Sequence, residues 1–170
     1  MIMRKITIVL SIVLLSSLGA KAQNAKLQSA FIYQFTKLIE WCPAGKSGDF
    51  KIGVLGSGSA VGKELDRLHG RNVGSQTIKI VSFPSPGSVA KCNILYVPSS
   101  YASKLGSLKS KLSGGCALVV CDKVGSYGRG ADISFDASGG RLSFEVNKTS
   151  MKGKGMKVSN KLVNLAKRSM

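Results

Sequence analysis

The fold is decided by a short apolar run and the glycine-rich turn that follows it, Phe50-Lys51-Ile52-Gly53-Val54-Leu55 and then Gly56-Ser57-Gly58-Ser59-Ala60-Val61-Gly62. The run is rich in β-branched and large apolar residues, which is typical of a strand, and residues 63–68 have the composition of a helix. Ser59 stands where the N-cap of that helix is expected. The segment is therefore predicted to be a strand, a tight turn and a helix, the opening unit of an α/β fold.

The glycine-rich turn matches neither common nucleotide-binding motif. The dinucleotide fingerprint needs Gly-x-Gly-x-x-Gly, but the three glycines here stand at 56, 58 and 62. It also needs an acidic residue about twenty positions later, and residues 78–82 carry no carboxylate. A phosphate-binding loop needs Ser or Thr after Gly-Lys, whereas Glu64 follows Lys63. The turn is therefore predicted to be structural, and no cofactor is expected.

The rest of the pattern extends this unit into a sheet. Further strands are predicted at 76–83, 92–97 and 116–121, and the last two are almost continuously apolar, as expected of strands covered on both faces. Helices are predicted at 25–41, 60–69, 102–112 and about 159–168. Alternation at 131–135 and 141–146 predicts a hairpin with one solvated face. The expected class is α/β, with a mostly parallel central sheet flanked by helices and a C-terminal antiparallel hairpin at the edge.

The first 22 residues are predicted to be a secretory signal peptide. Arg4 and Lys5 precede the apolar stretch 6–15, which is too short to span a bilayer, and an Ala-x-Ala site ends at Ala22, the predicted cleavage position. Removing 22 of the 170 residues leaves 148, which form one domain over residues 23–170. The formal net charge falls from +17 to +14, because three basic residues are lost with the peptide.

This excess of positive charge favours anionic partners, which outside the cytoplasm are membrane surfaces, glycans or acidic protein faces rather than nucleic acid. The charge is densest over residues 148–168, where seven residues are basic and none is acidic: Lys148, Lys152, Lys154, Lys157, Lys161, Lys167 and Arg168. The segment is either a solvated face or an electropositive docking surface, with Glu145 at its border able to orient a lysine. The partner-binding candidates are Glu145, Lys148, Lys157 and Lys161.

Four cysteines lie in the expected mature chain: Cys42, Cys92, Cys116 and Cys121. An even number in an oxidising compartment favours disulfides over metal binding or catalysis. The two ends of a 116–121 strand are about 16 Å apart, whereas a disulfide needs Cα atoms within about 7 Å, so Cys116 and Cys121 are not expected to pair. Parallel neighbouring strands could join Cys92 to Cys116 and leave Cys42 with Cys121. The sequence does not choose among the three connectivities, and Cys42 could be free.

No group of residues has the pattern of an active site or a metal centre. His69, the only histidine, stands at a predicted helix end, where an imidazole can cap terminal carbonyls. The sequence has no nucleophile elbow and no Cys-x-x-Cys or His-x-x-x-His spacing. The carboxylates of Asp132, Asp136 and Glu145 could meet across the hairpin, but they are expected on its solvated face. The sequence therefore favours a protein that is not an enzyme.

Six segments between residues 25 and 167 carry a family pattern in order: 31–41, 50–56, 91–97, 130–135, 144–147 and 157–162. Together they resemble the YfiR (HmsC-like) family of periplasmic regulatory proteins. The resemblance implies a periplasmic inhibitor, without catalytic activity, that binds the periplasmic domain of an inner-membrane signalling protein. That partner is a diguanylate cyclase of the YfiN type or a sensor kinase, so the inhibitor affects cyclic di-GMP signalling and biofilm formation.

The resemblance also implies intramolecular disulfides, a possible homodimer and an outer-membrane lipoprotein that sequesters the inhibitor. The sequence departs from the family pattern at Cys42 and Asn93, where proline and histidine are frequent. The alternative function is a periplasmic module that binds a small molecule or an anionic cell-wall glycan. Its pocket would lie near the carboxyl ends of the strands or on the basic C-terminal surface.

Overall fold

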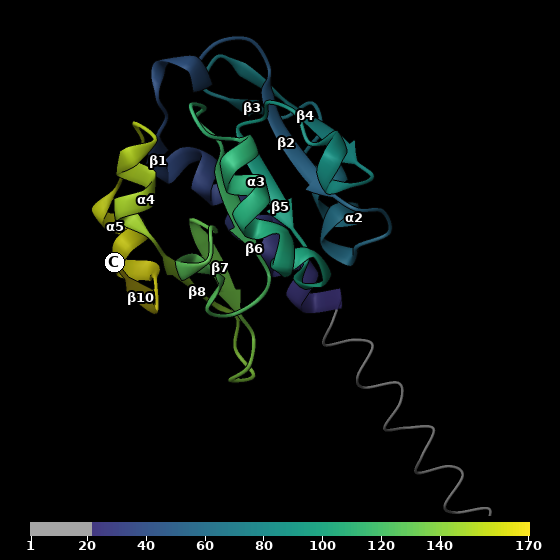
Figure 1. Ribbon diagram of the computed structural model, residues 1–170, viewed down its shortest axis with the longest axis vertical. Helices are drawn as coiled ribbons and strands as arrows, with labels where there is room; N and C mark the ends of the chain where they lie inside the picture. Colours follow the sequence, from purple (N-terminus) through teal and green to yellow (C-terminus); the bar gives the residue numbers. More distant parts are fainter. Residues whose placement is uncertain (1–21) are drawn as a thin grey trace, which may run out of the picture.

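An eight-stranded sheet runs through the centre of the computed structural model, which describes residues 22–170 (Figure 1). The sheet order is β10-β8-β7-β6-β5-β2-β4-β3. The strands are β2 (Phe50–Leu55), β3 (Asn72–Val73), β4 (Gln76–Phe83), β5 (Ile94–Val97), β6 (Leu118–Cys121), β7 (Ile133–Asp136), β8 (Ser143–Val146) and β10 (Arg168–Ser169). The predicted signal peptide lies outside the described residues, except for Ala22. None of the helices in the described part is long and apolar enough to cross a membrane.

The pairing of the strands confirms the predicted fold class. β2 pairs in parallel with both β4 and β5, and parallel pairing continues through β6 to β7. β7 and β8 form the predicted antiparallel hairpin. Two features were not expected. The short strand β10 pairs in parallel with β8, so it lies outside the hairpin at that edge, and the short strand β3 pairs antiparallel with β4 at the other edge.

The turn after β2 has the predicted strand-turn-helix form. Ser59 caps helix α2 (Ala60–Asp66), and its side chain accepts a hydrogen bond from the Gly62 N–H. Gly56 has a φ of +77°, and a Cβ at this position would come within 2.7 Å of the Tyr101 ring. Glycine is therefore required here both by backbone conformation and by the close approach of the aromatic side chain.

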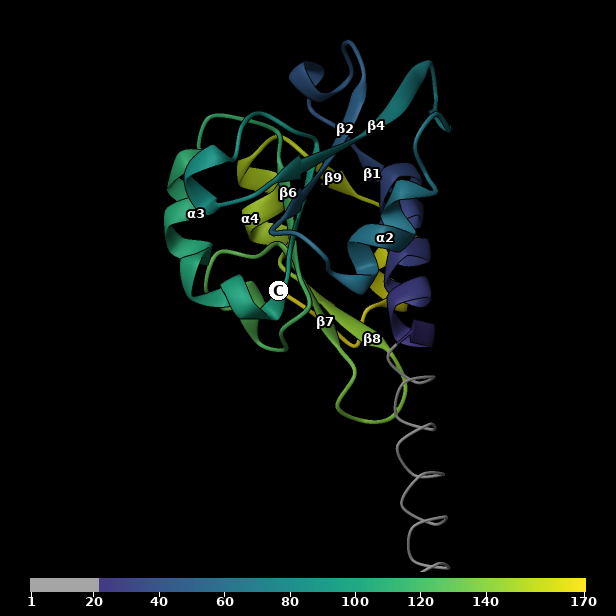
Figure 2. The ribbon, with the colours of Figure 1, turned by 90° about the vertical axis from the view of Figure 1, so that its right-hand side faces the viewer.

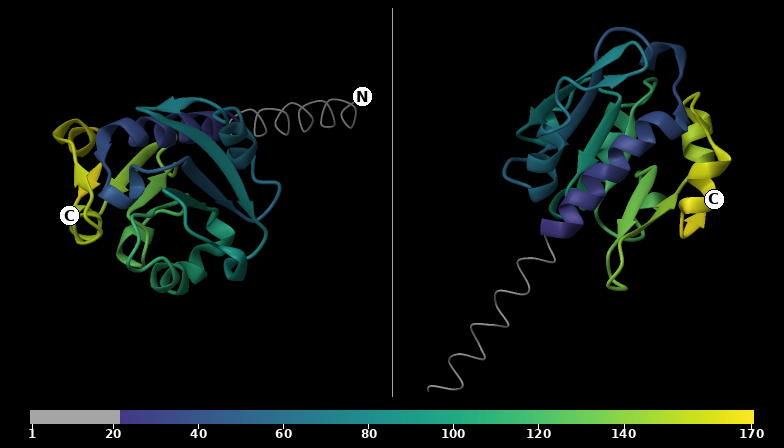
Figure 3. Two further views of the ribbon diagram at one scale, coloured as in Figure 1. Left: turned by 90° about the horizontal axis from the view of Figure 1, so that it is seen from above. Right: turned by 180° about the vertical axis from the view of Figure 1, so that it is seen from behind.

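Helices cover both faces of the sheet, and each face has its own apolar core. A helix over residues 22–38 and α2 cover one face, while the 3-10 segment η3 (Ser99–Lys104) and α3 (Leu105–Lys111) cover the other (Figure 2). The 22–38 helix crosses its face diagonally (Figure 3). Phe31 and Phe35 on this helix contact Phe135 and Phe144 of the hairpin, with ring centroids 5.2–6.2 Å apart. Phe35 is therefore a core residue, and Phe31 packs against the same core.

The prediction that one face of the hairpin is solvated is wrong. Phe135 and Phe144 face the first helix, but Ser134 and Glu145 on the opposite face are also buried. Residues 122–130 cover this second face, where the Gly125 N–H donates to the Glu145 carboxylate at 3.2 Å. The alternation of apolar and polar residues therefore marks a polar interior rather than a surface in contact with water.

The C-terminal segment returns to the end of the first helix. The strands β1 (Ile39–Glu40) and β9 (Lys157–Val158) form a separate antiparallel pair. Two short helices flank β9, α4 (Lys148–Gly153) before it and α5 (Asn160–Leu165) after it. Ser159 caps α5 by accepting from the Leu162 N–H at 3.2 Å. The remaining 3-10 turns are η1 (Pro43–Gly45), η2 (Pro86–Ser88) and η4 (Ser126–Gly128).

Candidate functional site

A disulfide joins Cys42 to Cys116, whose Cα atoms are 6.0 Å apart, just before β6 begins. The expected exclusion of a bond between Cys116 and Cys121 is confirmed, but the pairings of Cys92 with Cys116 and of Cys42 with Cys121 are wrong. Cys92 and Cys116 precede neighbouring strands, yet their side chains enter the cores on opposite faces of the sheet. The thiols of Cys92 and Cys121 are free and buried. Burial raises the pKa of Cys92 to about 12 and also raises the pKa of Cys121, so both are poor nucleophiles.

Cys42 and Asn93, where the sequence departs from the family pattern, both anchor the loop between the first helix and β2. Cys42 fixes the start of η1 through the disulfide. Asn93 fixes its end, because its amide nitrogen donates to the Gly45 carbonyl at 2.8 Å and its amide oxygen accepts from the Lys51 N–H at 2.9 Å. The loop between the first helix and β2 is therefore anchored to the amino ends of the central strands at two points.

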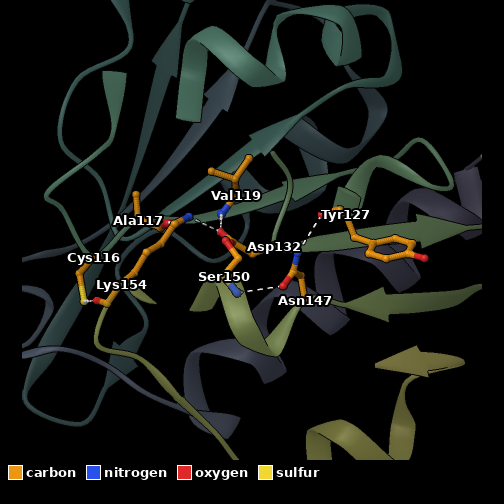
Figure 4. Close-up of polar contacts among 8 residues, drawn as sticks. All are labelled: Cys116, Ala117, Val119, Tyr127, Asp132, Asn147, Ser150 and Lys154. Atoms are coloured by element: carbon orange, nitrogen blue, oxygen red, sulfur yellow. Dashed lines mark hydrogen bonds and ion pairs between the residues drawn. The ribbon is translucent and has the colours of Figure 1, made fainter. Parts of the chain in front are cut away.

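Beside the disulfide, a buried ion pair joins Asp132, just before β7, to Lys154, just after α4 (Figure 4). Asp132 is fully buried and accepts from the Val119 N–H at 2.7 Å and from the Ser150 hydroxyl at 2.7 Å. It also accepts from the Lys154 ammonium at 2.5 Å, and this ammonium donates in addition to the Ala117 carbonyl at 2.9 Å. The carboxylate thus has three donors, which compensate for the cost of burying its charge.

The helix that carries Lys154 is itself held in place by a cap. Asn147 accepts from the Ser150 N–H at 2.8 Å and donates to the Tyr127 carbonyl at 3.0 Å, so it links α4 to the 122–130 segment (Figure 4). The Cys116 sulfur lies 4.0 Å from the Lys154 carbonyl oxygen. The disulfide, the ion pair and the capped helix therefore form one connected support.

A groove of about 440 Å³ lies over this support, between the end of α3 and α4. It is lined by Lys109 of α3, by the 113–115 loop and by Thr149, Ser150 and Lys154 of α4, and none of its lining residues is acidic. Because Cys116 and Ala117 lead into β6, the groove lies at the amino ends of the parallel strands. The hollow at the carboxyl ends, beside the 56–59 turn, is smaller, at about 220 Å³.

The structure divides the basic C-terminal segment into internal and external residues. Lys154 and Lys167 pair with the buried carboxylates of Asp132 and Asp136. Of these two lysines only Lys154 is enclosed, because the Lys167 side chain is 60% exposed. The other five basic residues of the segment are also exposed: Lys148, Lys152, Lys157, Lys161 and Arg168. After Asp66, every exposed charged side chain in the described part is a lysine or an arginine, because the later carboxylates are buried or half-buried. The exposed charge of this later part of the chain is therefore all positive, although the exposed Glu40 of β1 lies beside Lys157.

Of the four partner-binding candidates, three are exposed and one is buried. Lys148 and Lys161 are exposed, and Lys157 forms a solvent-exposed pair with Glu40 at 3.6 Å. Glu145 is buried and accepts from Gly125, and no lysine among the described residues forms an ion pair with it, contrary to the expectation that it would orient one. Glu145 therefore supports the 122–130 segment, and contact of these residues with a partner stays a prediction.

His69 does not cap the carbonyl groups of α2. Its side chain is exposed, and its Nδ1 accepts from the Ile80 N–H at 3.4 Å. This contact links the residues after α2 to β4. In the described part of the chain, no three His, Cys, Asp or Glu side chains are grouped as metal ligands.

The pair between Asp136 and Lys167 predicts a pH-dependent contribution to stability. Hydrogen bonds from the Lys167 ammonium, and then from the Ser138 hydroxyl and N–H, hold the pKa of Asp136 well below its ordinary value of 3.8. A carboxyl group whose pKa is lower in the folded state than in the unfolded state stabilises the protein in full when the pH is above its unfolded-state pKa. This stabilisation is lost as the pH falls through its folded-state pKa. Asp136→Asn is therefore expected to lower the free energy of unfolding at pH 7, with a difference from wild type that shrinks below pH 4.

Urea denaturation at pH 7, 5, 4 and 3 measures this difference. Lys167→Gln removes the largest cause of the pKa shift and is expected to show part of the same trend. A difference between Asp136→Asn and wild type that stays constant from pH 7 to pH 3 would contradict the assignment.

Comparison with known proteins gives one family match. The family model described as YfiR/HmsC-like matches residues 25–167. No curated protein matches the chain. Solved structures that match include a conserved domain protein from Vibrio cholerae, with a TM-score of 0.56 and 13% identity, over 86% of this chain and 60% of that chain. Another is an ABC domain in complex with L-Trp from Streptococcus pneumonia, with a TM-score of 0.56 and 14% identity, over the same two shares. This chain thus spans 60% of the length of both structures, and likeness at this identity shows the fold alone.

Proposed function

This chain belongs to the YfiR/HmsC-like family of periplasmic regulators, and on that premise we propose that it binds and inhibits an inner-membrane signalling protein from the periplasmic side. The partner is a diguanylate cyclase of the YfiN type or a sensor kinase. Inhibition of a cyclase lowers cyclic di-GMP and with it biofilm formation. The match of the family model over residues 25–167 is the observation that carries this proposal.

The chemistry of the cysteines supports a site of action outside the cytoplasm. The disulfide between Cys42 and Cys116 fits an oxidising compartment. Export through a signal peptide that ends at Ala22 is part of the same proposal. The proposal also includes a homodimer and sequestration of the inhibitor by an outer-membrane lipoprotein.

The surface charge supports docking to an acidic protein face. Lys148, Lys157 and Lys161 are exposed around α4, β9 and α5, and no exposed carboxylate occurs on the described chain after Asp66. Complementary charge of this kind speeds association and excludes partners of like charge. The docking surface that we propose consists of these three lysines.

Expression of the full chain together with its membrane cyclase tests the function. We expect lower cyclic di-GMP than with the cyclase alone, and recovery of both proteins together from solubilised membranes, identified by mass spectrometry. A version that lacks residues 1–22 and stays in the cytoplasm serves as the control and is expected not to repress. Unchanged cyclic di-GMP, no change in histidine kinase output and no co-purified membrane protein would together contradict the proposal.

Charge reversal at Lys157 and Lys161 is expected to weaken docking while the melting temperature stays nearly unchanged. Among the described residues, Lys157 pairs only with Glu40, and the two side chains are 80% and 56% exposed, so their separation has little effect on folding. The measurement is repression of the cyclase, together with a thermal melt of the purified protein. Lys104→Glu with Lys123→Glu adds the same charge at exposed positions outside the proposed docking surface. Full repression by the Lys157 and Lys161 variant would show that these lysines only interact with solvent.

A further inference from the structure

Lys154 is the most enclosed cation at the groove over the disulfide. Its side chain is 16% exposed and lines the groove. Two of the three hydrogens on its ammonium are directed to Asp132 and Ala117. The third hydrogen has no recorded partner among the described residues, and it is held in place by the two bonds already made. A fixed donor of this kind is suited to donate a hydrogen bond to an oxygen atom of a ligand.

The surroundings of Lys154 in the groove supply further donors and no competing carboxylate. Lys109 is exposed on the facing helix α3, and Thr149 contributes a hydroxyl group, whereas the Ser113 hydroxyl already donates to the Ser110 carbonyl. Within residues 22–170, Asp132 is the only carboxylate that pairs with Lys154, and it is fully buried and accepts from three donors. The first N–H groups of α4, those of Lys148 and Thr149, already donate to the Met170 carbonyl, so the free donors come from side chains.

The size and walls of the groove restrict what it can hold. A volume of about 440 Å³ falls within the range of pockets that bind small molecules. Leu112 and Cys42 add apolar surface beside the polar groups. The disulfide and the buried ion pair fix the floor, so a ligand would meet a site that is already formed.

We propose that this groove binds a small organic anion through a carboxylate or phosphate group held between Lys109 and Lys154. The carbon skeleton of the ligand lies against Leu112. This site involves no partner protein and does not depend on the proposed regulatory function. A bound anion adds negative charge beside Lys148 and Lys152 of α4.

Calorimetric titration with citrate and, separately, with inorganic pyrophosphate tests the site on the disulfide-bonded protein in 150 mM NaCl. Saturable binding of one ion per chain is expected for at least one probe. Citrate alone identifies a carboxylate ligand, and pyrophosphate alone identifies a phosphate ligand. In amide NMR spectra, the largest shifts are expected at residues 113–115 and 149–154.

Two variants and two matched controls decide whether the site is specific. Lys109→Gln removes one groove cation and is expected to weaken binding by about tenfold, the effect of losing one charge-assisted hydrogen bond. Ser113→Glu places a carboxylate at the rim and is expected to abolish binding. The controls Lys104→Gln and Ser107→Glu make the same changes at exposed positions outside the groove and are expected to alter binding less than twofold. Absence of saturable binding, or equal weakening by variants and controls, would overturn the proposal.

Discussion

Replacing Cys42 and Cys116 together by alanine is expected to lower the free energy of unfolding by about 4 kcal/mol. The disulfide joins residues 74 positions apart, so it strongly restricts the unfolded chain. It also anchors the loop after the first helix to the start of β6. Urea denaturation at 25 °C measures the loss, and a protein with a stability typical of small domains would be left only marginally folded.

Reduction provides the matched test of this prediction. Dithiothreitol is expected to bring wild type to the stability of the Cys42→Ala and Cys116→Ala double variant, and to leave that variant unchanged. Cys92→Ala with Cys121→Ala keeps the disulfide and removes only buried thiols, so its stability should still fall on reduction. If reductant leaves the wild-type stability unchanged, the cross-link is not a source of stability.

Asp132→Ala is expected to cost about 3–5 kcal/mol, because it leaves the Lys154 ammonium without its counter-charge at a mostly buried position. It also removes the acceptor for the Val119 N–H and the Ser150 hydroxyl. The measurement is again urea denaturation, with circular dichroism to confirm that the variant folds.

A double-mutant cycle separates the ion pair from general damage. Asp132→Asn and Lys154→Met each leave one buried partner unpaired, whereas the combined variant leaves neither charge. We expect the combined variant to be more stable than the sum of the two single effects predicts. Additive effects would show that the two side chains are not coupled, although their charged atoms are 2.5 Å apart.

The strands were predictable because their signal is local. Apolar runs at 50–55, 94–97 and 118–121 are long enough to exclude a solvated face, and the glycines after the first run mark its turn. The hairpin shows the limit of this reasoning. Alternation states which side chains are polar, but it cannot distinguish water from a buried polar contact. Ser134 and Glu145 are polar and buried.

The candidate site was harder to predict because it depends on distant segments. The sequence grouped the basic residues 148–168 as one surface, whereas the structure uses Lys154 internally and brings Lys109 from α3 to the same groove. Asp132 was the available signal: a carboxylate beside the apolar strand residue Ile133 requires a partner if it is buried. The disulfide pairing depended on which face of the sheet Cys92 and Cys116 enter before their strands begin. No local pattern specifies that direction.

The contact between the first helix and the hairpin also affects how the polypeptide matures. Phe31 and Phe35 are synthesised early, but Phe135 and Phe144, which complete their aromatic cluster, follow about a hundred residues later. The strand β1 pairs with β9, which follows it at an even greater separation along the chain. A chain that enters a new compartment from its amino end must therefore keep its first helix exposed until nearly all of it has arrived, and a chaperone that shields amphipathic helices should increase its yield.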